Sequence, residues 1–179
     1  MSETYKIKIA GLERELKRFP VSDKMDIAAF ILFGDVEITV AAATELLKKA
    51  PDFDYILTPE AKSIPLAYEM ARQSGKPYVV ARKGVKVYMG NPIKAEVLSI
   101  TTQKLQTLYL GEDECNLIRG KKVLIVDDVI STGESLEAVR KLVKNAEANE
   151  AAACAVLAEG DAAERHDIIY LEELPLFFK

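Results

Sequence analysis

The sequence predicts an α/β fold in which a mainly parallel sheet is flanked by helices. Short apolar runs typical of buried strands alternate with longer segments of helical periodicity, a pattern that favours parallel pairing. Charged or hydroxylated residues follow three of these runs directly, at 58–63, 82–86 and 127–135. Because such sheets bind ligands beyond the carboxyl ends of their strands, we expect these three loops to converge on one site.

The first part of the chain predicts an N-terminal arm followed by a helix. Residues 5–9 alternate apolar and charged side chains, which indicates a half-exposed strand, whereas 12–33 has only weak periodicity. A helix is predicted over 36–49. Its expected apolar face consists of Val36, Val40, Ala43, Leu46 and Leu47.

The middle of the chain alternates strands with helices. A short strand is predicted at 55–57, and a helix follows from Ile64 to about Ser74, closed by Gly75. A buried strand at 77–81 comes next. A further strand at 95–100 precedes the polar segment 101–110, which has little pattern.

The last part of the chain continues the alternation. Residues 123–126 form a short continuous apolar run, typical of a strand buried on both faces. An amphipathic helix follows, to about Lys144, and a buried strand is predicted at 151–157. After a turn at 160–161, a last short strand is predicted at 168–171.

Length and composition indicate one soluble domain over 1–179, with 1–35 as an N-terminal arm. A net charge of −4 does not indicate the basic surface that nucleic-acid binding needs, so we expect no nucleic-acid partner. The charged N-terminus and the lack of long apolar runs predict no membrane partner and a cytoplasmic protein. We therefore expect Cys115 and Cys154 to be reduced, and the single histidine, His166, to be solvated.

The segment 121–139 carries the strongest functional signal. Asp127 and Asp128 directly follow the buried apolar run, and small and hydroxylated residues then open the helix. The N–H groups of a helix start can hold a phosphate, and the acids can hold sugar hydroxyls directly or through Mg²⁺. The segment is not a Walker A loop, because no Gly-Lys-Ser/Thr closes it.

Two less specific interpretations of this segment are an ordinary strand-to-helix turn with an exposed acid pair, and a receiver domain. A receiver domain would place the pair after its first strand, whereas most of this fold precedes Asp127.

The segment instead resembles the phosphoribosyl pyrophosphate (PRPP) motif of the type I phosphoribosyltransferases: a strand, two acids, two apolar residues, then a small residue, Thr-Gly and a hydroxyl. The resemblance extends from about Val21 onward and is closest to the adenine and xanthine enzymes. It implies the type I phosphoribosyltransferase fold, in which 1–35 would form a small N-terminal hood, and a homodimer. It also implies transfer of a phosphoribosyl group from PRPP to a purine, with Mg²⁺ bound mainly through PRPP.

The resemblance assigns a role to each matching residue. Those expected to be catalytic are Asp127 and Asp128, which would also contact the metal, and Lys104 in a loop that closes over the reacting centre. The 5′-phosphate would be held by Ser131, Thr132, Gly133, Glu134 and Ser135. The carboxylate of Glu134 is expected to turn to solvent, away from the phosphate.

The pyrophosphate of PRPP would be held by Ala61, Lys62, Arg82, Lys83 and Lys86. In the family the loop that carries the lysine can contain a cis non-proline peptide, which here would be Glu60–Ala61 or Ala61–Lys62. Phe33 and Val129 are the expected contacts to the base.

Two features of the sequence favour adenine as the base. Ser131 stands where hypoxanthine-guanine enzymes have an aspartate, and TPEAKSIPLAYEMAR is similar to adenine-type sequences. Gln106, in place of a loop glutamate found in many adenine enzymes, favours a 6-oxopurine such as xanthine. We predict adenine. An orotate-type enzyme is an alternative within the class, and a PRPP-binding regulator without useful turnover is one outside it.

Overall fold

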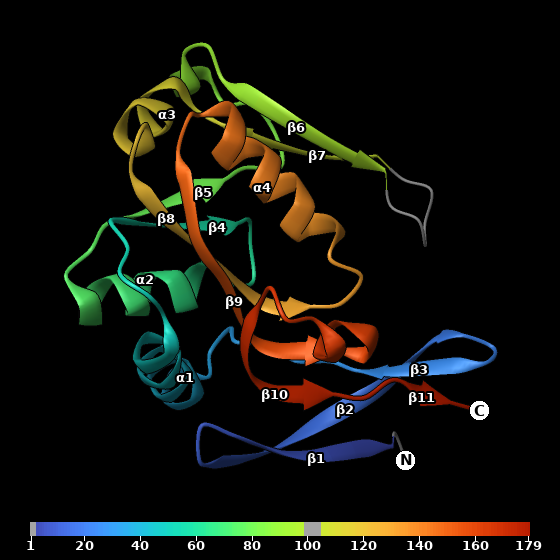
Figure 1. Cartoon of the computed structure of the whole chain (residues 1–179). Helices are drawn as coiled ribbons and strands as arrows, with labels where there is room; N and C mark the ends of the chain where they lie inside the picture. The colour runs from blue at the N-terminus through green and yellow to red at the C-terminus, as the bar shows by residue number, and fades with distance from the viewer. Residues whose placement is uncertain (1–2, 99–104) are drawn as a thin grey trace.

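The computed structural model describes residues 3–98 and 105–179. Its centre is a five-stranded parallel sheet with the strand order β10-β9-β8-β4-β5 (Figure 1). These strands are β4 (Tyr55–Pro59), β5 (Tyr78–Ala81), β8 (Lys122–Ile130), β9 (Asn149–Glu159) and β10 (Ile169–Leu174). The predicted fold class is confirmed.

Both faces of the central sheet are buried, and β8 contributes to each. Val123 and Ile125 pack with α3 (Glu112–Ile118), α4 (Glu134–Asn145) and the hairpin of β6 (Ile93–Leu98) and β7 (Leu105–Leu110). Leu124 and Val126 pack on the opposite face with α1 (Val36–Lys49) and α2 (Ile64–Ser74). This two-sided burial explains why residues 123–126 are continuously apolar.

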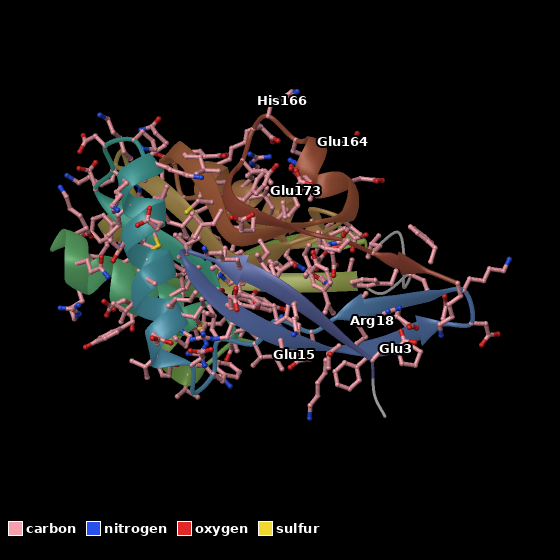
Figure 2. The ribbon with its side chains drawn as sticks, turned by 90° about the horizontal axis from the view of Figure 1, so that it is seen from below. Glu3, Glu15, Arg18, Glu164, His166 and Glu173 are labelled. Carbon is pink, nitrogen blue, oxygen red and sulfur yellow. The ribbon has the colours of Figure 1, made fainter. Side chains whose placement is uncertain are left out.

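A second, antiparallel sheet contains β1 (Thr4–Ile9), β2 (Leu12–Ser22), β3 (Met25–Ala28) and β11 (Phe177–Phe178), in that order. The guanidinium of Arg18 lies 4.1 Å from the ring centroid of Phe177 and pairs with Glu3, which lies beside it in Figure 2. The predicted strand at 5–9 is confirmed. The hairpin of β2 and β3 and the short β11 were not expected, because their sequence periodicity is weak.

Helix α1 has the predicted bounds, but its predicted apolar face is only partly right: Ala43 and Leu46 are buried and Leu47 packs against the core, whereas Val36 and Val40 are exposed. Its buried residues are Ile38, Thr39, Ala42, Ala43 and Leu46. Val36 is 72% exposed and Val40 is 38% exposed. The first turn is fixed by Asp35, whose carboxylate accepts a hydrogen bond from the Ile38 N–H and pairs with Arg14 of β2. The cap thus fixes the start of the helix on the side where Ile38 is buried.

Several other element bounds differ from the prediction. Strand β8 continues through Asp127 and Asp128 to Ile130, and residues 105–110 form β7 in place of a polar loop. Helix α3 was not expected, nor were the two short 3₁₀ helices, Val87–Met89 and Gly160–Glu164. In the part of the chain that the structure describes, no helix is long and apolar enough to span a membrane.

Candidate functional site

The loops that follow β4, β5 and β8 meet at the carboxyl edge of the central sheet. Strand β4 pairs with β5 on one side and with β8 on the other, so the three strand ends are neighbours. Oε2 of Glu60 accepts a hydrogen bond from the Lys83 N–H at 2.9 Å. Nζ of Lys62 lies 2.8 Å from Oδ2 of Asp128. These two contacts join all three loops, which confirms the predicted convergence.

The loop between β4 and α2 is fixed by two buried hydroxyl groups. Oγ1 of Thr58 donates to Oγ of Ser63 at 2.7 Å, and Ser63 donates to the Pro59 carbonyl at 3.1 Å. The Glu60–Ala61 peptide bond is cis, at the first of the two positions expected from the resemblance. Ala61 and Lys62 are exposed, so the loop presents its backbone and one lysine at the site.

The acid pair lies within β8. Asp128 is buried, with 4% of the residue exposed, and Asp127 is half-buried. Oδ1 of Asp127 accepts a hydrogen bond from the Asp128 N–H at 2.9 Å. Burial and, next, the charge of Asp128 raise the pKa of Asp127 well above its ordinary value, and Lys62 opposes this shift. The charge of Asp128 is therefore balanced by Lys62, whereas Asp127 holds a proton more readily than a free aspartate does.

The loop after β5 gathers positive charge around Glu60. Nε of Arg82 lies 3.3 Å from Oε2 of Glu60, and Nη1 of Arg82 donates to the Tyr88 hydroxyl at 2.7 Å. The Lys83 N–H, more than Arg82, lowers the pKa of Glu60. The side chains of Lys83 and Lys86 are exposed. An ionised carboxylate thus orients Arg82 at the site, and the two lysines are open to an anionic ligand.

The turn from β8 into α4, residues 131–135, is the segment predicted to hold the 5′-phosphate, and we call it the phosphate loop. Gly133 has φ +81° and is the N-cap of α4. Because a glycine has no side-chain oxygen to cap the helix, the first N–H groups of α4 are left for water or an anionic ligand. The expectation that Glu134 turns to solvent is wrong, since this residue is only 9% exposed. Thr132 is exposed, and Ser131 and Ser135 are half-buried.

The hairpin of β6 and β7 packs along α4. Oγ of Ser135 donates to Oε1 of Gln106 at 3.2 Å, and Nζ of Lys141 donates to the Glu96 carbonyl at 3.2 Å. Gln106, which stands where many adenine enzymes have a loop glutamate, is thus in contact with the phosphate loop. Lys104, predicted to be catalytic, lies outside the described residues.

The two residues expected to contact the base lie in different surroundings. Phe33 is 56% exposed and lines a groove of about 550 Å³ between α1 and α2, which Val129 does not line. Val129 is half-buried and packs against the core that includes Leu124 and Val126. Their roles stay predictions. His166 is exposed, as expected, and projects from the surface in Figure 2.

A metal site made by protein side chains alone is not found among residues 3–98 and 105–179, where no three histidine, cysteine or acidic side chains are suitably grouped. Asp127 and Asp128 offer oxygen atoms, which Mg²⁺ prefers. Because Asp128 is already paired with Lys62, this donor set fits a Mg²⁺ ion held mainly by the oxygens of a bound phosphate ligand.

Two residues near the site, Glu60 and Arg165, were not predicted from the sequence. Glu60 organises the cations after β5, and its place next to the cis peptide was the one available signal. Arg165, in the turn before β10, reaches the phosphate loop. A Cβ atom added to Gly133 would lie 2.6 Å from its Nη1. No local pattern connects residues so far apart in the sequence.

Comparison with known proteins gives a consistent result. The family model described as the phosphoribosyl transferase domain matches residues 36–174, more than half of the chain. The hypoxanthine/guanine phosphoribosyltransferase of Methanothermococcus okinawensis is 36% identical over 147 residues, which are 81% of this chain and 73% of that protein. The adenine phosphoribosyltransferase of Thermotoga neapolitana is 39% identical over 108 residues, 60% of each chain. The match thus spans less than two thirds of that relative.

The purine biosynthesis transcriptional repressor of Bacillus subtilis is also similar. It is 30% identical over 113 residues, 63% of this chain and 39% of the repressor. Among solved structures, adenine phosphoribosyltransferase from Saccharomyces cerevisiae, complexed with an imino-altritol bisphosphate and adenine, superposes with a TM-score of 0.70. The identity is 25%, and the superposition covers 88% of this chain and 93% of that one.

Proposed function

This chain belongs to the phosphoribosyltransferase family, and we propose that it transfers a phosphoribosyl group from PRPP to a purine base. The products are a nucleoside monophosphate and pyrophosphate. The observation that carries the proposal is the meeting of three groups at one edge of the sheet. These groups are the acid pair of β8, the start of α4 and the cations of the loops after β4 and β5.

Each group meets a different part of PRPP. The N–H groups at the start of α4 hold the 5′-phosphate, and Asp127 and Asp128 hold the ribose hydroxyls and would supply oxygen atoms to a Mg²⁺ ion bound with PRPP. Lys62 and Arg82 neutralise the departing pyrophosphate. Catalysis rests on positioning and on this neutralisation, because the bond at C1′ breaks ahead of attack by the base.

Adenine is the proposed base. The similarity to the adenine phosphoribosyltransferase from Thermotoga neapolitana supports this choice. The sequence around Glu60, which is similar to adenine-type sequences, supports it as well. The relative from Methanothermococcus, which acts on hypoxanthine and guanine, keeps a 6-oxopurine as the competitor. A pocket that pairs with the 6-amino group leaves a buried polar group unpaired when it meets a 6-carbonyl, which produces strong selectivity.

A homodimer is part of the proposal. The groove between α1 and α2 is lined by large apolar side chains with much of their surface exposed, including Phe33 (56%), Val36 (72%) and Tyr68 (56%). Patches of this kind commonly mark interaction sites. Light scattering on the purified protein gives its mass in solution.

The test of the proposed function is a panel of free bases. Adenine, hypoxanthine, guanine, xanthine and orotate are each incubated with PRPP and Mg²⁺, and pyrophosphate release is measured. We expect release with adenine, together with AMP. Turnover of another purine without AMP formation would show that adenine is the wrong base, whereas the assignment as a phosphoribosyltransferase would stand.

The second candidate function is a PRPP-binding regulator, which the similarity to the Bacillus repressor favours. A regulator binds PRPP in a titration but releases no pyrophosphate with any base of the panel. The same two measurements therefore separate an enzyme from a regulator.

A further inference from the structure

We propose that Arg165 is a further binding residue for the 5′-phosphate of the sugar ligand, with its guanidinium acting as the cation of the phosphate loop. This inference rests on the proposed function, and it adds a residue from the turn before β10, outside the PRPP motif.

The first observation is the contact between Arg165 and Gly133. A Cβ atom at Gly133 would lie 2.6 Å from Nη1 of Arg165, closer than a real Cβ atom approaches, and 3.6 Å from its Cζ, an ordinary contact distance. The absent side chain of Gly133 therefore admits the guanidinium to the backbone of the loop. The positive φ of Gly133 favours glycine independently.

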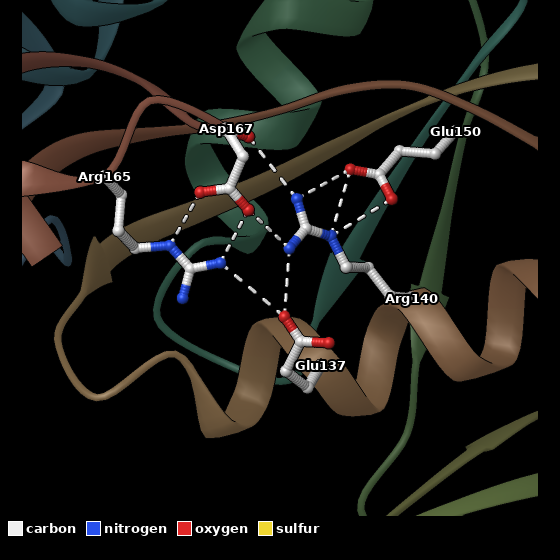
Figure 3. A network of polar contacts seen from close by, with 5 residues as sticks. All are labelled: Glu137, Arg140, Glu150, Arg165 and Asp167. Atoms are coloured by element: carbon white, nitrogen blue, oxygen red, sulfur yellow. Dashed lines mark hydrogen bonds and ion pairs between the residues drawn. The ribbon is translucent and has the colours of Figure 1, made fainter.

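The second observation is the orientation of the guanidinium, shown in Figure 3. Its Nε and Nη2 donate to the two carboxylate oxygens of Asp167, at 2.9 and 2.7 Å. Nη2 also lies 3.6 Å from Oε1 of Glu137 in α4. A planar guanidinium held on this edge keeps Nη1, its remaining terminal nitrogen, directed at Gly133. Arg165 is thus oriented before any ligand arrives.

The third observation is the charge of the loop. Residues 131–135, STGES, contain no lysine or arginine, and their one ionisable side chain is the buried carboxylate of Glu134. A phosphate dianion bound at this loop therefore finds no cationic side chain within the loop itself. The guanidinium of Arg165, beside Gly133, is a cation from outside the loop that can supply this charge.

The neighbouring Arg140 provides a matched control. It shares Glu137 and Asp167 with Arg165, at 2.9 and 2.8 Å, and binds Glu150 as well, but it does not come within 4 Å of a Cβ atom added to Gly133. Replacing Arg140 loosens the same network and leaves the cation at the loop.

The experiment measures binding of ribose 5-phosphate and of inorganic pyrophosphate to the full chain by calorimetry. Arg165→Gln should weaken the binding of ribose 5-phosphate about tenfold or more, which is the effect of losing a charge-assisted hydrogen bond. The affinity for pyrophosphate, which lacks the 5′-phosphate, should change less than about twofold, as expected for a substitution remote from the pyrophosphate. Arg165→Lys should restore part of the loss, and Arg140→Gln should retain most of the affinity.

A second readout separates charge from structure. The phosphate monoester loses its second negative charge below about pH 6, so wild-type affinity should fall as the pH is lowered through this value. The fall should be smaller in Arg165→Gln, because the cation that prefers the dianion is gone. A purely structural role of Arg165 would leave the two pH profiles parallel.

The possible outcomes are distinct. If Arg165→Gln binds ribose 5-phosphate as the wild type does, or if Arg140→Gln loses as much affinity, the inference is overturned and the proposed function stands. If the wild-type protein binds neither ribose 5-phosphate nor PRPP, the proposed function fails, and the inference fails with it.

Discussion

Nζ of Lys62 and Oδ2 of Asp128 lie 2.8 Å apart, and they join the exposed loop after β4 to the buried end of β8. The lysine side chain is 51% exposed and that of Asp128 only 6%. The pair therefore has two uses: it neutralises a buried acid, and it places a cation where the proposed pyrophosphate leaves.

Removing Lys62 should affect both stability and binding. Lys62→Met leaves the charge of Asp128 buried without this partner, so the free energy of unfolding should fall by about 1–2 kcal/mol, less than for a fully buried pair because Lys62 is half exposed. Urea unfolding measures this fall, and PRPP affinity should decline as well. The double variant Lys62→Met/Asp128→Asn should recover much of the stability. If it does not, the pair is not coupled as the distance suggests.

Asparagine at either acid should damage catalysis without unfolding the protein. Asp127→Asn and Asp128→Asn keep the side-chain shape but remove a charge that contacts the ribose and Mg²⁺ in the proposed complex. We expect turnover with adenine and PRPP to fall roughly tenfold or more for each, as for other preorganised charges at a reacting centre. Circular dichroism should stay near that of the wild type. Unchanged kinetics in both variants would remove the proposed role of the pair.

Asp127→Asn should also change the pH dependence of stability. Burial and the nearby Asp128 raise the folded-state pKa of Asp127 above its unfolded value. The stability that Asp127 contributes is therefore present below the unfolded pKa and is lost as the pH rises through the folded one. At pH 7.5 Asp127→Asn should unfold at a higher urea concentration than the wild type, and the difference should vanish once the pH falls below the unfolded pKa.

Asp167→Asn is the control for this comparison, because its effect on stability at pH 7.5 should have the opposite sign. Hydrogen bonds from Arg165 and, to a lesser extent, Arg140 lower the pKa of Asp167 below its ordinary value. Its contribution is present above the unfolded pKa and lost as the pH falls, so Asp167→Asn should be less stable than the wild type at pH 7.5. A gain in stability at pH 7.5 for both variants would contradict these assignments.

Arg82→Ala tests the cation cluster after β5. Arg82 is positioned by Glu60 and Tyr88 at the edge of the sheet. Its loss should lower the affinity for pyrophosphate and for PRPP by about tenfold or more, which is the effect of losing a hydrogen bond to a charged group. The affinity for AMP should change much less. An equal loss for pyrophosphate, PRPP and AMP would make Arg82 a structural residue. Lys86→Ala, which removes an exposed lysine of the same loop, is the comparison variant.

The sequence was sufficient to predict the parts of the fold that depend on local patterns. The bounds of α1 and α2, and the presence but not the full length of the five central strands, follow from periodicity, a glycine C-cap and continuous apolar runs. Strand-end loops could be placed together because the topology of a parallel sheet fixes their relation. The cis peptide at Glu60–Ala61 was expected only from resemblance to the family.

The remaining features depend on contacts between distant segments. The side of α1 that is buried is set by packing and by the pairing of Asp35 with Arg14, which no helical periodicity reveals. Burial of Glu134 and the approach of Arg165 to Gly133 likewise depend on where other segments lie. Residues of this kind are missed because their local sequence is that of an ordinary surface turn.

The pairing of β3 with β11 has a consequence for synthesis of the protein. Asp26 lies opposite Phe177, and Met25 opposite Phe178, so the two strands come from distant parts of the chain. During translation the strands β1, β2 and β3 emerge long before their fourth neighbour, and β3 has an open edge throughout this time. Unpaired edges are prone to join other chains, and closing so distant a contact is slow. Residue 178 must therefore leave the ribosome before this sheet can be completed, so β3 keeps an open edge in the nascent chain until then.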